Sequence, residues 1–201
     1  MSHLSENETH RNHQNFAIRR IAKEHQLSAS SPPEDASAQR AEDRLRHLAE
    51  TDALTGLANY RRLSEAVESE IKRSERTTRA FAVLIFDLNG MKRINDRHGH
   101  QAGNCALCRL ADIFRSSCRS IDTAARYGGD EFAIVLPETD AKEADAVRRR
   151  ICERLSNDRE EPRLSMCVGV AIYPEDGTTN ETLFQAAEDE LLQMKHLKNT
   201  L

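Results

Sequence analysis

Residues 80–88 form a run of apolar side chains that a single acidic residue, Asp87, interrupts just before its end. A run of this length without polar alternation is typical of a central strand that is buried on both faces. A carboxylate at the end of such a strand is unfavourable unless it is paired or bound to a metal. The run therefore predicts the middle of a β-sheet and marks Asp87 as a candidate functional residue.

The rest of the pattern predicts an α/β (α+β) fold. Residues 123–127 and 131–136 flank Gly128 and Gly129, which is a hairpin signal. Apolar residues recur at helical spacing in segments 63–71, 103–114, 144–155 and 184–194, and alternate with small residues in segment 164–172. Because helices and strands alternate along the chain, we expect a mixed sheet with helices packed on one face or on both.

Three regions precede or make up this fold. Residues 1–36 are rich in small polar and helix-breaking residues and are expected to be a flexible or partly helical tail. Residues 37–50 are expected to form a linker or signalling helix, with a narrow apolar seam at Ala38, Ala41, Leu45 and Leu48. This helix could pack on its own domain or form a dimer stalk, and the sequence favours neither. Residues 51–201 are the expected globular domain.

Composition narrows the function classes. The net charge of -4 gives no basic excess, so nucleic-acid binding is not expected. No stretch of 18 apolar residues and no secretory signal are present, which predicts a cytoplasmic protein without direct membrane insertion. The five cysteines are expected to be reduced. Cys105 and Cys108 match the C-x-x-C spacing, but no second pair follows, which favours a packed helix face over a zinc site.

The hairpin adds two further acidic residues to Asp87. Asp130 and Glu131 follow Gly128 and Gly129, which lack side chains and let a large ligand approach the backbone. If the hairpin pairs with the first strand, Asp87 and Asp130 come together, and a hard cation such as Mg²⁺ relieves their repulsion when phosphates complete its shell. The alternative for an isolated Gly-Gly-Asp is a solvated turn.

Several motifs together resemble the GGDEF family, the diguanylate cyclases. The five letters of the family motif stand at residues 128–132. Three other segments agree with the family in order and spacing, namely 52–63, 87–103 and 169–177. The resemblance covers about residues 50–199. It implies a ferredoxin-like core similar to nucleotidyl cyclases, a homodimer, and condensation of two GTP into cyclic di-GMP with release of two pyrophosphates.

The resemblance also assigns roles to residues. It implies that Asp87, the Leu88 carbonyl and Asp130 hold Mg²⁺, and that Asp130 or Glu131 helps to deprotonate the 3′-hydroxyl. Lys92 and Lys195 should contact phosphate oxygens, as these transfers depend on positioning and charge neutralisation. The remaining residues should bind the substrate. Asn95 and Asn104 should read the guanine base, with His100 nearby, and Gly128 and Gly129 should let the nucleotide approach the hairpin backbone. Arg119 and Asp122 match the family's R-x-x-D inhibitory product site, although a surface ion pair is the alternative.

Two positions depart from the family pattern. The family usually has aspartate where this chain has Asn104, and an amide leaves one guanine donor unmatched. This predicts weaker GTP binding, slower turnover or relaxed base choice. In the last helix, Lys195 is kept, but Asn199 stands where the family has a basic residue, with Lys198 as a shifted substitute. The alternatives to an active cyclase are a degenerate domain that binds GTP or cyclic di-GMP, and a dimerising adaptor with a vestigial pocket.

Overall fold

A computed structural model describes residues 40, 42, 44–45 and 48–199, with side chains up to residue 197. The chain divides into two units, residues 1–46 and 47–201, and each is described by itself. In the first unit the described residues are helical and exposed, including Leu45. The expected tail, and Ala38 and Ala41 of the apolar seam, lie outside the described residues. Leu48 belongs to the second unit and is also exposed.

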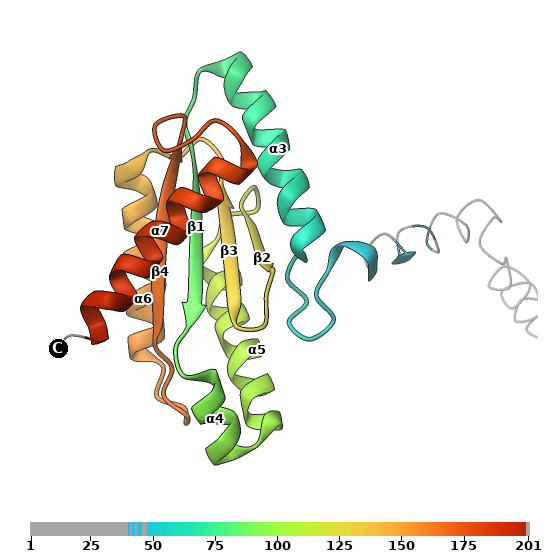
Figure 1. Ribbon diagram of the computed structural model, residues 1–201. Helices are drawn as coiled ribbons and strands as arrows, with labels where there is room; N and C mark the ends of the chain where they lie inside the picture. The colour runs from blue at the N-terminus through green and yellow to red at the C-terminus, as the bar shows by residue number, and fades with distance from the viewer. Residues whose placement is uncertain (1–39, 41, 43, 46–47, 200–201) are drawn as a thin grey trace, which may run out of the picture. The chain divides into compact units, whose positions relative to one another are not determined.

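The second unit is built on a four-stranded sheet in the order β2-β3-β1-β4 (Figure 1). The strands are β1 (Phe81–Leu88), β2 (Thr123–Arg126), β3 (Glu131–Leu136) and β4 (Met166–Tyr173). All pairings between these strands are antiparallel, and an isolated bridge between Ala58 and Ala125 is parallel. With its helical crossovers, this order is the ferredoxin-like arrangement, so the expected fold class is confirmed.

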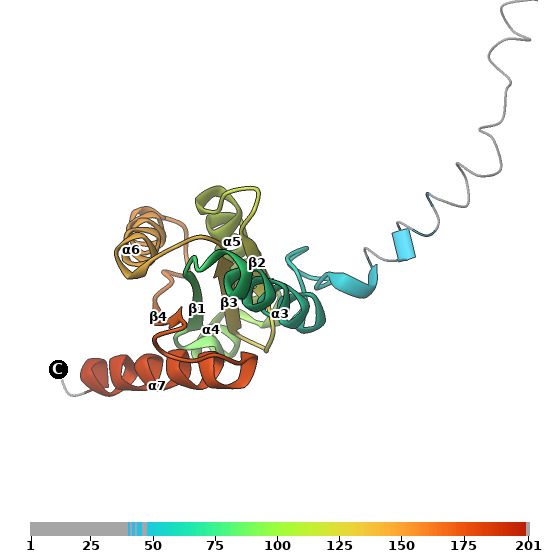
Figure 2. The same cartoon turned by 90° about the horizontal axis from the view of Figure 1, so that it is seen from above.

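Helices cover both faces of the sheet (Figure 2). α3 (Tyr60–Thr77) and α7 (Asn180–Asn199) pack on one face, and α5 (His100–Ser117) and α6 (Ala141–Asn157) pack on the other. β1 is buried between the layers and divides its side chains by alternation: Leu84 and Phe86 face α5 and α6, whereas Val83 and Ile85 face α3 and α7. The apolar run at 80–88 is therefore the central strand that the sequence predicts.

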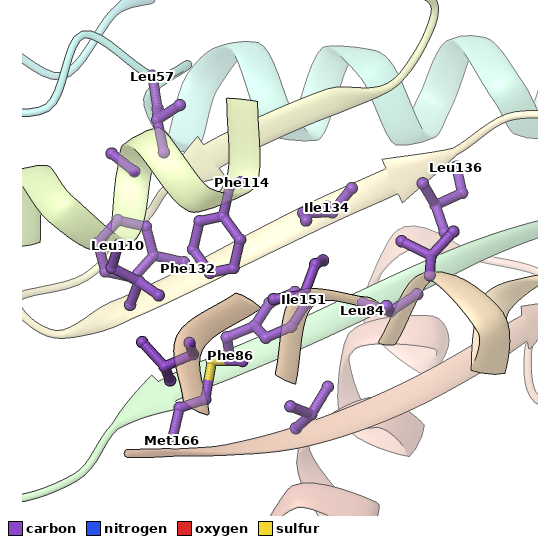
Figure 3. Packing of buried hydrophobic residues seen from close by; sticks show 14 of the residues in the cluster. Leu57, Leu84, Phe86, Leu110, Phe114, Phe132, Ile134, Leu136, Ile151 and Met166 are labelled. Atoms are coloured by element: carbon purple, nitrogen blue, oxygen red, sulfur yellow. The ribbon is translucent and has the colours of Figure 1, made fainter. Parts of the chain in front are cut away.

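Aromatic packing ties the hairpin strand to the central strand. On the α5 side, the ring of Phe114 lies 4.7 Å from that of Phe86 and 5.3 Å from that of Phe132, measured between centroids (Figure 3). All three rings are fully buried. Since Phe86 is next to Asp87 and Phe132 next to Glu131, this cluster holds the carboxyl end of β1 and the hairpin in fixed register.

The structure differs from the sequence-based boundaries in two places. A separate helix, α4 (Met91–His98), follows β1, and the chain turns at Gly99, whose φ of 83° favours glycine, before α5 begins. The apolar spacing within residues 103–114 reports only α5, because α4 buries just one apolar residue, Ile94. The last strand begins at Met166, two residues after the expected start at Leu164.

Candidate functional site

The carboxyl end of β1 meets the tip of the hairpin. Asp87 is paired in register with Glu131, and the Leu88 N–H donates to the Asp130 carbonyl at 3.0 Å. Asp87 and Asp130 both line one cleft of about 950 Å³. The structure therefore brings together the two carboxylates that the sequence analysis expected to meet.

Basic residues complete the walls of this cleft. Lys92 reaches it from α4 and Lys195 from α7, so that both predicted phosphate contacts lie beside the acidic end of β1. The Lys195 ammonium lies 2.7 Å from Asp87 Oδ2, and the Asp87 side chain is 16% exposed. The ion pair supplies the counter-charge that a carboxylate at the end of a buried strand needs.

The Glu131 side chain folds back over the first hairpin glycine. A Cβ at Gly128 would stand 2.1 Å from Glu131 Oε2, so any other residue there would force the Glu131 side chain to move, whereas Gly129 faces open space. Partial burial of Glu131, followed by the charges of Asp87 and Asp130, raises the pKa of its carboxyl above the usual value. A carboxyl with a raised pKa is suited to accept a proton near neutral pH.

An arginine that the sequence analysis did not single out anchors the hairpin tip. Arg126, the last residue of β2, donates from Nη2 to the Gly129 carbonyl at 2.6 Å and pairs with Asp52 at 3.3 Å. Burial opposes ionisation of Asp52, but hydrogen bonds from Thr55 and the charge of Arg126 lower its pKa overall. The signal available in the sequence was a charged residue at the end of a short strand, two residues before the first glycine.

The predicted base-reading residues lie apart from the walls of the cleft. Asn95 is on α4, and its Oδ1 is buried with no hydrogen-bond partner among the described residues. That oxygen faces Gly103, where a Cβ would stand 2.0 Å away. His100 and Asn104 are exposed on the first turns of α5. The three residues thus flank the α4–α5 junction rather than the acidic end of β1.

Arg119 and Asp122, the R-x-x-D motif, form an ion pair at 3.1 Å, which is the contact that the alternative to a product site describes. The Asp122 side chain is fully enclosed and also accepts from the Arg119 backbone N–H at 2.7 Å. The Arg119 side chain is 49% exposed, and its guanidinium donates to the Pro137 carbonyl and to Thr139 Oγ1. Both members of the motif are therefore already engaged with the protein.

Other sequence features have simpler surroundings. Cys105 and Cys108 carry free thiols on α5, and the Cys108 thiol donates to the Leu54 carbonyl at 3.4 Å. Among the described residues, no group of three or more His, Cys, Asp or Glu side chains could hold a metal ion. A cation beside Asp87 and Asp130 would therefore need oxygen ligands from the backbone and from a bound phosphate.

No helix within the described part of the chain is long and apolar enough to cross a membrane.

Replacing Glu131 with glutamine is expected to raise the melting temperature at pH 7 by roughly 1–3 °C, because the charge of Glu131 is unfavourable in the fold. A carboxyl whose folded pKa is raised stabilises the fold below its unfolded pKa and loses that contribution as pH rises through the folded pKa. The difference between the variant and the wild type should therefore vanish at about pH 4. Thermal melts from pH 4 to 8 test this, and a variant less stable than wild type at pH 7 would count against it.

Comparisons with known proteins agree on one family. The family model for "Diguanylate cyclase, GGDEF domain" matches residues 49–200. The chain is 36% identical over 160 residues to MucR of Pseudomonas aeruginosa, named a bifunctional diguanylate cyclase/cyclic di-GMP phosphodiesterase, and the match covers 78% of this chain and 23% of MucR. The aligned part is likewise a minor share of other relatives, from 20% of an uncharacterized signaling protein of Caulobacter vibrioides to 38% of the diguanylate cyclase DgcM of Escherichia coli.

Two solved structures are similar in fold and sequence. A sensory box/GGDEF family protein from Caulobacter crescentus is 35% identical, with a TM-score of 0.68, over 73% of this chain and 98% of the other. The diguanylate cyclase SiaD of Pseudomonas aeruginosa, solved with its activator SiaC, is 28% identical, with a TM-score of 0.70, over 94% of this chain and 74% of the other. Fold, motif and sequence thus lead to one conclusion: the chain belongs to the diguanylate cyclase family through a GGDEF domain at residues 49–200.

Proposed function

We propose that this chain condenses two molecules of GTP into cyclic di-GMP and releases two pyrophosphates. The observation that carries the proposal is the meeting of Asp87 and Asp130 in one cleft with Lys92 and Lys195. Paired carboxylates beside two lysines suit a divalent cation and a polyphosphate together. The carboxylates compensate the charge of the cation, and the lysines and the cation compensate the charge of the polyphosphate. The printed names of relatives such as MucR support the same reaction.

The acidic end of β1 fits Mg²⁺ as the cofactor. Asp87, Asp130 and the Leu88 carbonyl would supply hard oxygen ligands. The ion pair between Lys195 and Asp87 shows that this carboxylate already has a cation as its neighbour. When bound, the ion would neutralise charge at the reacting phosphate and polarise it.

The chain's own side chains supply the remaining steps. Lys92 and Lys195 compensate phosphate charge, and Asp130 or Glu131 accepts the proton of the attacking 3′-hydroxyl, a role that suits the raised pKa of Glu131. Asn95, Asn104 and His100 read the base. Gly128 and Gly129 let the nucleotide approach the hairpin backbone.

One domain holds one GTP, so the reaction needs two domains face to face. A homodimer would supply this proximity, and the helix that the sequence predicts at residues 37–50 would set the orientation of the two domains. Product inhibition at Arg119 and Asp122 belongs to the same proposal. Because Asp122 is enclosed, cyclic di-GMP would first have to draw Arg119 away from Thr139 and Pro137.

The second candidate is a domain that binds GTP or cyclic di-GMP without turnover, and Asn104 is the observation that favours it. An amide at this position opposes one guanine donor but suits the donor and acceptor of adenine. A cyclase with relaxed base choice, which makes a mixed product, is a variant of the first candidate. Incubation with GTP, ATP and Mg²⁺, followed by mass spectrometry of the products, separates the three outcomes.

Replacing Asn104 with aspartate is expected to raise kcat/KM for GTP about tenfold, because the carboxylate accepts from both guanine donors. The matched control is Gln101→Glu, which adds the same charge to the same exposed first turns of α5. Initial rates of cyclic di-GMP formation measure the effect. An equal change in both variants would show that charge alone matters and that position 104 does not read the base.

A further inference from the structure

The cleft contains two arginines to which neither the motif nor the resemblance gives a role. Arg93 and Arg97 lie on α4 and line the cleft together with Lys92. Residues 92, 93, 96 and 97 share one side of α4, while Ile94 is buried under it. A cleft wall of three basic side chains on one short helix is thus set opposite the acidic end of β1.

These basic side chains have no partner in the described part of the protein. No hydrogen bond or ion pair involves the side chain of Lys92, Arg93 or Arg97 within residues 48–197. Arginines elsewhere in the domain are usually engaged: Arg109 pairs with Asp158, and Arg126 with Asp52. The cleft is therefore a place where guanidinium groups are left available to a ligand.

The charges of the cleft favour a polyanion. The cleft is lined by four cationic side chains and three carboxylates: Lys92, Arg93, Arg97 and Lys195, and Asp87, Asp96 and Asp130. Lys195 forms an ion pair with Asp87. Arg93 also covers the start of α4, since its guanidinium would lie 3.3 Å from a Cβ at Gly90. A guanidinium fork binds phosphate oxygens in pairs, which suits it to the end of a polyphosphate better than to a single charge.

We propose that Arg93 and Arg97 bind the β- and γ-phosphates of the nucleotide triphosphate, and the pyrophosphate that it releases. The proposal rests on the proposed function, because it assigns the leaving group to one wall of the same cleft. Contacts to the leaving group are present before and during the reaction. Loss of either arginine should therefore raise KM for GTP more than it lowers kcat.

The test is the binding of GTP, GMP and inorganic tripolyphosphate to the full chain, measured by calorimetry in Mg²⁺ buffer. Arg93→Gln and Arg97→Gln should each weaken GTP and tripolyphosphate about tenfold, and the double variant about a hundredfold, whereas GMP binding should stay within about twofold. The matched control is Arg76→Gln on α3, an exposed arginine outside the cleft, which should change nothing. Because all three arginines are exposed, the variants should keep the wild-type melting temperature.

Three results would overturn the proposal: no binding of tripolyphosphate to the wild type, unchanged binding to the double variant, or equal loss of GTP and GMP. The last result would assign the arginines to the nucleoside or to a second copy of the chain. Failure of the proposed function is distinguishable. If tripolyphosphate binding depends on both arginines but GTP gives no cyclic product, the inference stands and the cyclase activity does not.

Discussion

Alanine in place of Asp130 is expected to lower the rate of cyclic di-GMP formation on the order of 10³-fold, equivalent to about 4 kcal/mol of transition-state stabilisation. The reason is that Asp130 stands at the hairpin tip beside Asp87, in a cleft that a metal and a triphosphate must share. A single carboxylate already paired with Lys195 would not hold the cation. Product formation from GTP and Mg²⁺, quantified by mass spectrometry, measures the effect.

The fold should survive this change. The Asp130 side chain makes no hydrogen bond or ion pair within the described residues, and its carbonyl, which accepts from Leu88, is retained in the variant. Asp189→Ala on α7 is the control, because it removes an exposed carboxylate of the same domain outside the cleft. Activity of Asp130→Ala within tenfold of the wild type would refute the assignment of the site.

The second large effect is on stability. Replacing Gly169 of β4 with alanine is expected to lower the free energy of unfolding by about 3 kcal/mol, and the melting temperature by roughly 6–12 °C. A Cβ at this position would stand 1.8 Å from the Ala187 carbonyl oxygen and 2.7 Å from the Leu191 backbone nitrogen. Both atoms belong to the backbone of α7, so the helix itself would have to move away from the sheet.

This displacement should also affect the site, because α7 carries Lys195 to Asp87. The control is Gly129→Ala, where a Cβ meets nothing within 4 Å, and its melting temperature should match the wild type. Differential scanning calorimetry on the two variants measures the contrast. A fall of less than about 2 °C in Gly169→Ala would mean that α7 is not fixed on the sheet at this glycine.

The sequence predicted those parts of the fold whose residues follow a simple period or a turn rule. The apolar run ending at Asp87 and Leu88 predicted β1, and the paired glycines predicted the hairpin, because burial on both faces and backbone freedom leave direct marks in the sequence. α4 was missed since one buried residue, Ile94, produces no period. Its end at Gly99 depends on a positive φ, which composition alone does not reveal.

The candidate site, too, was predictable in part. Asp87, Asp130, Lys92 and Lys195 were expected together and line one cleft. Contacts between side chains that are distant in sequence were not predictable: the ion pair of Arg126 with Asp52, and the hydrogen bond from Arg119 to Thr139, arise only when the strands assemble. The expected roles of Asn95, His100 and Asn104 stay predictions, since these residues lie outside the walls of the cleft.

The most direct test of the site is Mn²⁺ binding, followed by electron paramagnetic resonance in the presence of a non-hydrolysable GTP analogue. We predict that the wild type binds Mn²⁺ at least about tenfold more tightly than Asp130→Ala does, because the variant has lost one of two carboxylate ligands. The difference should depend on the nucleotide, whose phosphates complete the shell. Equal Mn²⁺ affinity in the two proteins with the analogue bound would contradict the view that the end of β1 and the hairpin tip share a cation.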